Sequence, residues 1–552
     1  MATSQHDSTS TSATVRHQVG EGFQLLQQYR LADAIRLSDA LVSEHPRNAE
    51  VLFLASEVRL AADDAQGALA FISAAVEAAP GELPLLIKKA DNLIMLRRRL
   101  DAKQTATVAA DVAGNDGQAL WAIGKIYSRC DDPINARRLY EQALAALGND
   151  PALLFDLALA QVHTGDMDGS EKNLELLLAQ APATGHALHL RSTLRRQTDA
   201  ANHVAALETR LAAGFPNPVA RAACLYALAK ELEDLGQPDR SFAVLAEGAA
   251  LRRQSITYDA AAERASIDGV RQTFTAEVMQ TGLAGDPAGK ATGHDEAGAI
   301  FIVGMPRTGT TLLERMLGRH SEVKSAGELL DFGQLLASSA RASMEANPGT
   351  TLLEASLRID FAALGRDYMV GAREAASGSP VFIDKMPINY IYCGLIRQAL
   401  PNARIIHLVR DPMDSCYAAY KTLFNQAYYF SYALDELADY YICYHRMMRH
   451  WHDAMPGAIL DVRYEDLVAD TEGQARRVLA WCGLDWQAAV LTPSGNDAPS
   501  TTASAAQVRE PIHAGSVQKW RRYEAGLAPL RARLAAAGVV DIEEQASRLP
   551  GL

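Results

Sequence analysis

The chain has 552 residues, which is too long for one ordinary domain, so we expect at least two. Hydrophobic residues make up 48% and charged residues 22%, a composition typical of a soluble globular protein. The net charge of -13 argues against a general nucleic-acid surface and against a footprint on an anionic membrane, although it leaves room for local basic pockets.

Residues 1–14 are polar and lack the apolar core of a signal peptide, so we expect a disordered N-terminus. No stretch of the chain reaches the roughly 18 uncharged apolar residues that span a bilayer. The six cysteines are scattered and form no C-x-x-C pair, which favours reduced thiols in a cytoplasmic protein without a bound metal. They are Cys130, Cys224, Cys393, Cys416, Cys443 and Cys482.

Residues 15–255 alternate amphipathic helical segments with breaks that recur every 34 positions. The breaks fall at Pro46, Pro80, Gly114, Gly148 and Pro182. Small residues recur at the same interval in two series, which are Ala34, Ala68, Ala102, Ala136 and Ser170, and Gly22, Ser56, Ala90, Gly124 and Ala158. Small side chains at fixed positions let paired helices approach closely, and this unit resembles the tetratricopeptide (TPR) repeat.

The repeat pattern weakens beyond Pro182, where Arg191–Gly214 and a unit around Ala229, Gly236 and Ser241 fit it less well. We therefore expect five regular repeats followed by two degraded ones. The resemblance implies a curved all-α TPR solenoid whose concave face binds peptides or a protein partner. A purely structural or oligomerising array is an equal alternative, because the sequence identifies no groove residue.

Residues 256–297 are expected to connect this array to a second domain at residues 298–552. We predict a bridging helix over Asp268–Met279 and a linker over Gln280–Ala297. Glycine and polar residues dominate that linker, which is typical of a connection without regular structure.

The apolar run Ala299–Val303 predicts a buried parallel strand, and a helix is expected to begin at Thr310. A strand, a turn over Gly304–Gly309 and a helix start together aim backbone N–H groups and a positive helix end at an anion. The spacing approaches that of a nucleotide P-loop, but Thr310 replaces the P-loop lysine and the cation is Arg307. This difference argues against ATP hydrolysis, although a Mg²⁺-dependent P-loop kinase or NTPase and an ordinary connection are alternatives.

The segment Pro306-Arg-Thr-Gly-Thr-Thr311 resembles the 5′-phosphosulfate loop of sulfotransferases. These enzymes use 3′-phosphoadenosine-5′-phosphosulfate (PAPS), and an arginine at the Arg307 position is similar to the tyrosylprotein sulfotransferase branch. The resemblance implies that PAPS is the co-substrate and that its 5′-phosphosulfate is bound by Arg307, Thr308, Gly309, Thr310 and Thr311. It also implies a catalytic role for Arg307, which with Lys385 would stabilise charge on the sulfuryl and bridging oxygens.

Two further segments supply candidate catalytic residues. The resemblance implies that Glu328 is the general base, because an acceptor hydroxyl must lose a proton as it attacks sulfur, and the alternative is a helix-capping glutamate. It also implies that Lys385 contacts the bridging oxygen and the sulfuryl group, where a cation offsets developing charge. The alternative for Lys385 is a surface ion pair with Asp384. The segment Val381–Pro387 has no histidine, where small-molecule sulfotransferases place theirs, so the base role falls to Glu328.

The run Ala403–Val409 predicts another strand, and Arg410 follows its carboxyl end, where ligands of parallel sheets bind. The resemblance implies that Arg410 holds the 3′-phosphate of PAPS, a contact that suits a guanidinium. The family has a serine eight positions further on, where this chain has Ala418. Candidates to replace that serine are Ser415, Tyr420 and Lys421.

The junction Arg463–Leu467 (RYEDL) resembles one that sulfotransferases share, which implies that Tyr464 lies near the nucleotide. An alternative of equal weight is that Tyr464 packs under the helix expected from Thr471. The segment Val508–Trp520 resembles the loop that closes over the nucleotide, with Ser516 and Lys519 as candidate phosphate contacts.

These segments together predict a TPR solenoid followed by an α/β, P-loop-like sulfotransferase domain with a central parallel sheet. We expect transfer of the sulfuryl group of PAPS, without a metal, to a hydroxyl of a peptide or a small molecule, with a protein tyrosine as one candidate. A protein partner on the TPR face is expected, and neither nucleic acid nor a membrane. The alternatives are a P-loop kinase or NTPase and a TPR scaffold that carries an inactive sulfotransferase-like domain.

Overall fold

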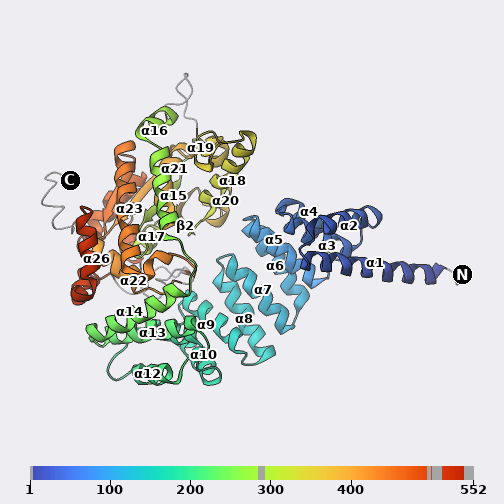
Figure 1. The fold of residues 1–552 in the computed structure, drawn as a ribbon, viewed down its shortest axis with the longest axis horizontal. Coiled ribbons are helices and arrows are strands. Elements are labelled where there is room, and N and C mark those ends of the chain that lie inside the picture. The colour runs from blue at the N-terminus through green and yellow to red at the C-terminus, as the bar shows by residue number, and fades with distance from the viewer. Residues whose placement is uncertain are drawn as a thin grey trace. The chain divides into compact units, whose positions relative to one another are not determined.

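The computed structural model describes residues 4–283, 293–424, 426–493, 499, 501 and 512–539. The chain divides into two compact units, residues 1–161 and residues 162–552, and each is described by itself (Figure 1). The linker predicted over Gln280–Ala297 and the loop predicted over Val508–Trp520 lie partly outside the described residues.

The first unit is a succession of helices joined by short turns (Figure 1). Its helices are α1 (Ser4–Gln27), α2 (Leu31–Glu44), α3 (Ala49–Ala61), α4 (Ala65–Ala78), α5 (Leu83–Met95), α6 (Arg99–Ala113), α7 (Gly117–Arg129), α8 (Pro133–Leu147) and α9 (Pro151–Thr164), the last of which crosses the unit boundary. The breaks predicted at 34-residue intervals fall in turns between helix pairs. Residues 4–14 belong to α1, whereas the sequence predicts disorder there.

The small residues of the repeat lie where paired helices touch, as predicted. Ala68, Ala102 and Ala136 are fully buried. A Cβ atom on Gly22 would lie 2.5 Å from Cδ2 of Leu54, and one on Gly124 would lie 2.5 Å from Cε1 of Tyr140. The helices can therefore pack this closely because these positions carry little or no side chain.

Carboxylate caps follow the same 34-residue period at the start of the second helix of several pairs. The side chains of Asp64, Asp132 and Asp166 each accept a hydrogen bond from the backbone N–H three residues further on. Such a cap satisfies one of the free N–H groups of a helix start. Arg98 occupies the equivalent position before α6 and makes no side-chain cap.

The second unit begins with helices that the sequence assigns to the repeat array. They are α10 (Met167–Gln180), α11 (Gly185–Thr193), α12 (Val204–Ala213), α13 (Pro218–Asp234) and α14 (Pro238–Gln254), followed by α15 (Ala260–Thr273) and α16 (Ala276–Leu283). Tyr226 of α13 and Leu245 of α14 share a hydrophobic core with Tyr432 and Trp520. The sequence predicts a domain boundary near residue 255, but this shared core joins the last repeats to the C-terminal half.

The C-terminal half is built on a five-stranded parallel sheet with the strand order β2-β3-β1-β4-β5, as the predicted fold class requires. Its strands are β1 (Ala299–Gly304), β2 (Val323–Gly327), β3 (Val381–Asp384), β4 (Arg404–Val409) and β5 (Ile459–Arg463). The central strand β1 is buried along its whole length, which explains its continuous apolar run.

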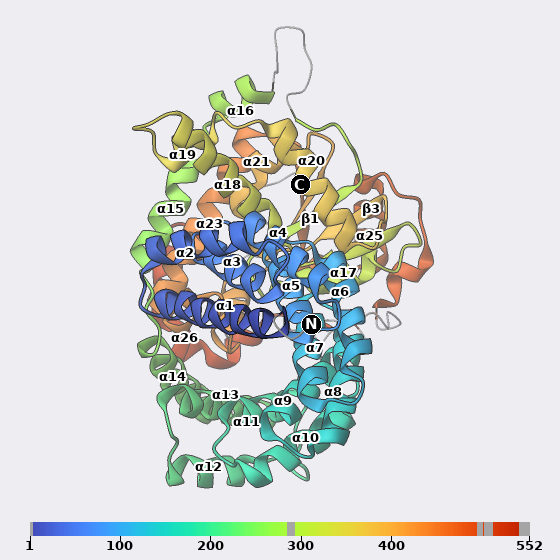
Figure 2. The ribbon, with the colours of Figure 1, turned by 90° about the vertical axis from the view of Figure 1, so that its right-hand side faces the viewer.

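Helices cover both faces of the sheet. Alternate residues of β1 point to opposite faces, so Ile300 and Ile302 pack with Leu313 of α17 while Phe301 packs with Tyr368 of α20. Figure 2 shows α17 and α20 next to the strands. The helices of this half are α17 (Thr310–Leu317), α18 (Asp331–Ala346), α19 (Leu352–Ser356), α20 (Phe361–Ala375), α21 (Cys393–Ala399), α22 (Pro412–Tyr420), α23 (Leu434–Ala454), α24 (Tyr464–Ala469), α25 (Thr471–Cys482) and α26 (Glu524–Ala536).

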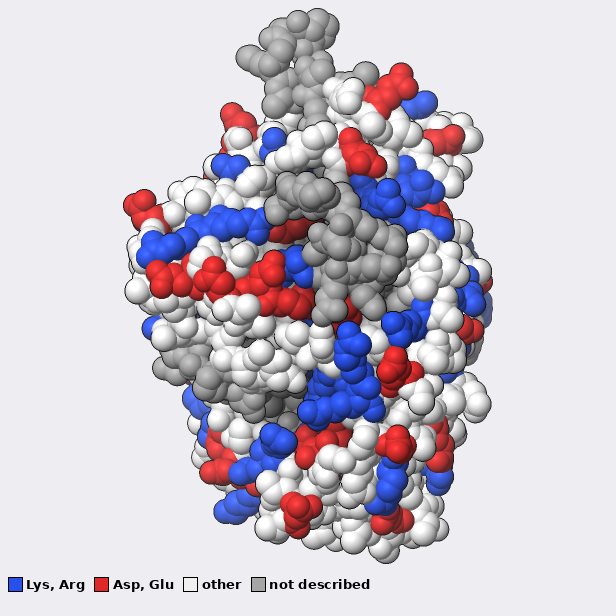
Figure 3. Space-filling model, turned by 90° about the vertical axis from the view of Figure 1, so that its left-hand side faces the viewer, with Lys and Arg blue, Asp and Glu red and all other residues white. Residues whose placement is uncertain are grey.

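No disulfide joins the six cysteines, and no helix among the described residues is both long and apolar enough to cross a membrane. On the face drawn in Figure 3, lysine and arginine side chains gather in small groups that stand beside acidic ones. Charges of both signs therefore mix on that face.

A valine at Gly124 should destabilise the repeat unit. Its Cβ would overlap the Tyr140 ring, and overpacking of this kind costs about 1–3 kcal/mol. We expect chemical denaturation, followed by circular dichroism, to show the loss for Gly124→Val. The control Gly20→Ala meets no atom within 4 Å and should be neutral or stabilising by about 0.5–1 kcal/mol, so equal behaviour of the two variants would contradict the packing role.

Candidate functional site

The loop between β1 and α17 has the backbone of an anion-binding turn. Arg307 has a φ of 68° and Gly309 a φ of 102°, both in the left-handed region, and the Thr308 hydroxyl donates to the Met305 carbonyl at 2.8 Å. Among the described residues, no backbone carbonyl accepts a hydrogen bond from the N–H groups of residues 308–311. The loop and the first turn of α17 therefore offer a row of backbone donors.

The two loop glycines are required by close neighbours. A Cβ on Gly304 would lie 2.6 Å from the Leu408 carbonyl oxygen of β4, and one on Gly309 would lie 2.6 Å from Cδ2 of Tyr464. Tyr464 begins α24, and its ring lies against the loop. The structure thus places Tyr464 beside the loop, while its predicted proximity to the nucleotide stays a prediction.

Arg410, which follows β4, joins the loop to the C-terminal segment. One guanidinium nitrogen donates to the Arg307 carbonyl at 3.1 Å and the other to the Ser516 carbonyl at 2.6 Å, and the group lies 4.7 Å from the centre of the Tyr464 ring. Burial and the nearby Arg410 lower the pKa of Arg307 to about 10. The buried Arg410 and the half-buried Arg307, beside N–H groups that no backbone carbonyl accepts from, make a strongly positive site that suits an anion.

Two of the three predicted catalytic side chains, Lys385 and Glu328, are in direct contact. Lys385 follows β3, its side chain is 1% exposed, and its ammonium forms an ion pair with Glu328, which follows β2. Glu314 of α17 lies on the same ammonium at 3.8 Å and accepts from the Ser325 hydroxyl. The adjacent carboxyl ends of β1, β2 and β3 thus bring the loop, the base candidate and the lysine together.

Asp384 has a role that the sequence does not reveal. It does not pair with Lys385. Its carboxyl accepts hydrogen bonds from the Tyr368 hydroxyl at 2.7 Å, the Asn389 amide at 3.1 Å and the Leu329 N–H at 3.3 Å. Asp384 therefore holds the turn that carries Glu328.

Two predicted nucleotide contacts are held by protein groups. Ser415 is fully buried, and its hydroxyl donates to the Arg410 carbonyl at 3.3 Å, so it supports the Arg410 turn. The ammonium of Lys519 forms an ion pair with Glu233 of α13. Ser516 lies beside Arg410 and offers its carbonyl there. The structure thus brings together Arg307, Thr308, Gly309, Thr310, Thr311, Glu328, Lys385, Arg410, Tyr464 and Ser516, while Ser415 and Lys519 serve protein contacts.

One group of described side chains could share a metal ion, and it includes no predicted site residue. The donor atoms of His407, His452 and Asp461 lie within 4.8 Å of one another. A single Asp461 oxygen is 2.8 Å from Nδ1 of His407 and 3.0 Å from Nε2 of His452, while Nε2 of His407 contacts the Tyr444 hydroxyl. These hydrogen bonds account for the cluster, so it gives no reason to assign a metal to the reaction.

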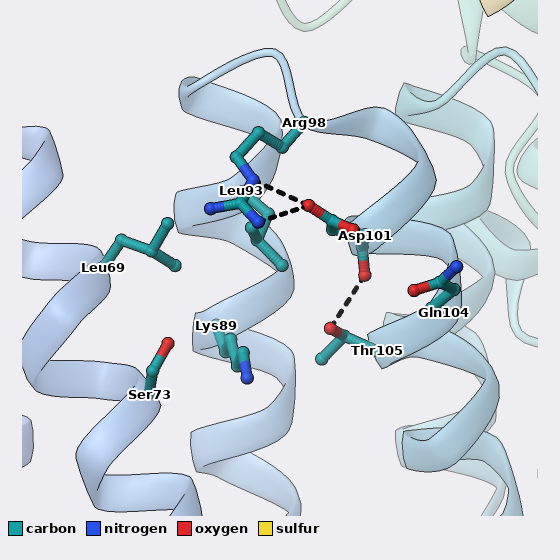
Figure 4. Close-up of a pocket in the computed structure, with 8 residues that line it drawn as sticks. All are labelled: Leu69, Ser73, Lys89, Leu93, Arg98, Asp101, Gln104 and Thr105. Atoms are coloured by element: carbon teal, nitrogen blue, oxygen red, sulfur yellow. Dashed lines mark hydrogen bonds and ion pairs between the residues drawn. The ribbon is translucent and has the colours of Figure 1, made fainter. Parts of the chain in front are cut away.

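The repeat unit has a groove of about 220 Å³ between α4, α5 and α6 (Figure 4). Arg98 donates to Asp101 at 2.6 Å on one side of it, and the Thr105 hydroxyl donates to the Asp101 carbonyl. Its lining residues are Leu69, Ser73, Lys89, Leu93, Arg98, Asp101, Gln104 and Thr105. The mixture of polar and apolar side chains suits a peptide or protein segment better than a small apolar ligand.

Comparison with known proteins agrees with the resemblance of the C-terminal half. The sulfotransferase family model matches residues 299–488. Protein-tyrosine sulfotransferase 2 of Gallus gallus is 24% identical over 263 residues, which are 43% of this chain and 68% of that protein. The predicted sulfotransferase-like domain is therefore confirmed.

A longer match joins both halves. An uncharacterised protein of Aquifex aeolicus (strain VF5) is 34% identical over 331 residues, which are 59% of this chain but only 43% of that protein.

Among solved structures, the sulfotransferase domain of the Synechococcus PCC 7002 olefin synthase has a TM-score of 0.31, 22% identity and coverage of 42% of this chain and 90% of that one. A thermophilic TPR protein of Thermus thermophilus has a TM-score of 0.25, 21% identity and coverage of 30% and 92%.

The buried Asp384 should give the protein a distinctive pH dependence. Burial raises the pKa of Asp384 from 3.8 to about 7, although Tyr368 and Leu329 donate to it. The folded protein then keeps a proton that the unfolded chain releases, so this carboxyl contributes stability below pH 4 that is lost as the pH rises to 7. We expect the melting temperature of wild type to fall relative to Asp384→Asn over this range.

The matched control is Asp367→Asn, which alters another acidic residue next to Tyr368. It should show no such trend. If wild type instead becomes more stable relative to Asp384→Asn as the pH rises, the three hydrogen-bond donors keep the Asp384 carboxyl ionised in the folded protein.

Proposed function

We propose that this protein is a PAPS-dependent sulfotransferase that moves the sulfuryl group in line to an acceptor hydroxyl. The observation that supports this most is the pair of guanidinium groups, the half-buried Arg307 and the buried Arg410, at the junction of β1, its loop and α17. Arg410 has no carboxylate partner among the described residues, so an anionic ligand would supply the missing counter-charge.

The donor fits this site by charge and by geometry. The N–H groups of residues 308–311 would hold the 5′-phosphosulfate, and Arg410 would hold the 3′-phosphate. The Tyr464 ring, already under the Arg410 guanidinium, would border the nucleotide. Thr310 stands where a P-loop has its lysine, and Arg410 adds a second arginine to the site. Both differences favour this donor over ATP.

The transfer would need two functions from the Glu328–Lys385 pair. The acceptor oxygen attacks sulfur, the bond from sulfur to the bridging oxygen breaks, and adenosine 3′,5′-bisphosphate leaves. Glu328, 38% exposed, takes the proton of the acceptor hydroxyl, while Lys385 offsets the charge that develops on the bridging oxygen. The donor's negative charge would compete for the Lys385 ammonium and so leave the Glu328 carboxylate able to accept the proton.

A tyrosine hydroxyl on a peptide is the acceptor that we favour. The similarity to protein-tyrosine sulfotransferases supports it, and so does the repeat unit, whose groove suits a peptide segment. The informative experiment is transfer of label from PAPS to a cell extract, with the sulfated product identified by mass spectrometry. Absence of any labelled product would favour a TPR scaffold with an inactive domain.

Removal of the Arg410 charge should abolish the preference for a 3′-phosphate. Calorimetry on wild type should show tighter binding of adenosine 3′,5′-bisphosphate than of adenosine 5′-phosphate or ATP–Mg²⁺. Arg410→Met should lose about 2–5 kcal/mol of that binding, the cost of removing one partner of a buried charged contact. Arg404→Met, at the exposed start of the same strand, is the control and should bind as wild type does. Tighter binding of ATP–Mg²⁺ by wild type would overturn the donor assignment.

Removal of the base should slow the chemical step and leave donor binding intact. We expect Glu328→Gln to lower kcat by about 10²–10⁴-fold with little change in KM for PAPS, because general base catalysis acts in the transition state. Glu322→Gln, an exposed glutamate in the turn before β2, should keep wild-type rates. Equal transfer by wild type and Glu328→Gln would remove this assignment.

A further inference from the structure

Glu233, near the C-terminal end of α13, reaches from the last repeat pair into the catalytic half. Its side chain is 8% exposed and has three partners that lie far from it in the sequence. The Tyr417 hydroxyl donates to it at 3.0 Å, Lys421 donates at 2.9 and 3.2 Å, and Lys519 forms an ion pair with it. One carboxylate therefore ties α13 to α22 and to the segment that precedes α26.

The charges in this cluster depend on Glu233. Burial alone would raise its pKa, but Lys421 and Lys519 override that effect and lower the pKa of Glu233 to about 2, so it is ionised at neutral pH. Burial lowers the pKa of Lys421 to about 8, and Lys519 opposes its charge further. Without Glu233, the two neighbouring ammonium groups, whose side chains are half-buried, would repel each other with no carboxylate between them.

Residues 512–523, here called the 512–523 segment, connect this cluster to the candidate site. The Ser516 carbonyl accepts from Arg410 at 2.6 Å. The Asp414 carboxylate accepts from the N–H groups of Gln518 at 2.6 Å and Trp520 at 3.0 Å. Asp414 thus fixes the backbone on both sides of Lys519, and Glu233 fixes the Lys519 side chain.

An aromatic contact reinforces the same attachment. The rings of Tyr417 and Tyr523 stack with their centres 4.4 Å apart, and the Tyr417 hydroxyl is the one that donates to Glu233. Phe242 of α14 lies 6.2 Å from Tyr523, ring centre to ring centre. Both helices of the last repeat pair therefore take part: α14 contacts Tyr523 of the 512–523 segment, and α13 contacts Tyr417 of α22, whose ring stacks on Tyr523.

We propose that Glu233 is a positioning residue that holds the 512–523 segment against Arg410, so that the last repeat pair completes the nucleotide site. This inference rests on the proposed function, since the nucleotide is the ligand whose 3′-phosphate Arg410 would hold. Glu233 acts through Lys519 and Ser516 and touches no reacting atom. Its loss should therefore weaken donor binding and leave the chemical step largely unchanged.

The test compares Glu233→Gln with Glu247→Gln, which breaks an exposed ion pair between α14 and Arg221 of α13. We expect Glu233→Gln to raise KM for PAPS and Kd for adenosine 3′,5′-bisphosphate about tenfold, as for coupling through a contact network. Its kcat should stay within about twofold of wild type, because the reacting groups are untouched. Hydrogen exchange in the 512–523 segment should become faster in this variant and not in Glu247→Gln.

A second variant guards against a folding defect. Lys519→Met removes the other end of the ion pair and leaves the α13 side intact, so it should raise Kd and hydrogen exchange as Glu233→Gln does. The double variant should then add little to either single one, which is the signature of a shared interaction. Additive losses in the double variant would show that the two residues act separately and would overturn the proposal.

Two results distinguish failure of this inference from failure of the proposed function. If wild type binds adenosine 3′,5′-bisphosphate and Glu233→Gln binds it equally well, or loses kcat with KM unchanged, the positioning role is refuted alone. If wild type binds no such nucleotide, the proposed function is refuted and the positioning role falls with it.

Discussion

The placing of two positive charges beside one loop, one buried and one half-buried, is the constraint that the rest of the catalytic half satisfies. Arg307 sits in a left-handed turn, and Arg410 donates to its carbonyl from the end of the neighbouring strand. Burying guanidinium groups is costly unless anions or acceptors compensate them. Gly304 and Gly309 allow the loop to fold this tightly, and the N–H groups of residues 308–311 add to the positive field. Such a site is prepared for a strongly anionic ligand.

A second set of charges lies at the ends of the strands on the other side of β1. Lys385 is enclosed, and Glu328 and Glu314 compensate its charge, while Asp384 holds the adjacent turn through hydrogen bonds. The parallel order β2-β3-β1-β4-β5 places the carboxyl ends of all these strands along one edge. Two guanidinium groups, an ammonium and its partner carboxylate therefore lie along one edge of a single sheet.

The helical repeats do not all form a module separate from the catalytic half. Their last pair, α13 and α14, shares a hydrophobic core with the C-terminal half, and Glu233 contributes a buried charge to it. The earlier repeats form a compact unit of their own with a groove lined by mixed side chains. The repeats are thus divided between two compact units, the earlier ones in the first and the last pair in the second.

The sequence by itself determined the local structures: the 34-residue helix pairs, the buried strands, and the loop from Gly304 to Thr311, because each depends on side chains and backbone close together along the chain. It also indicated Arg307, Glu328, Lys385 and Arg410. Only the tertiary structure decided the partners of charged groups, such as Glu233 with Lys421, 188 positions apart, or Asp384 with Leu329, 55 positions apart. It also showed that Ser415 and Lys519 are engaged by protein groups, since which carboxylate or carbonyl a buried polar group meets depends on how distant elements pack.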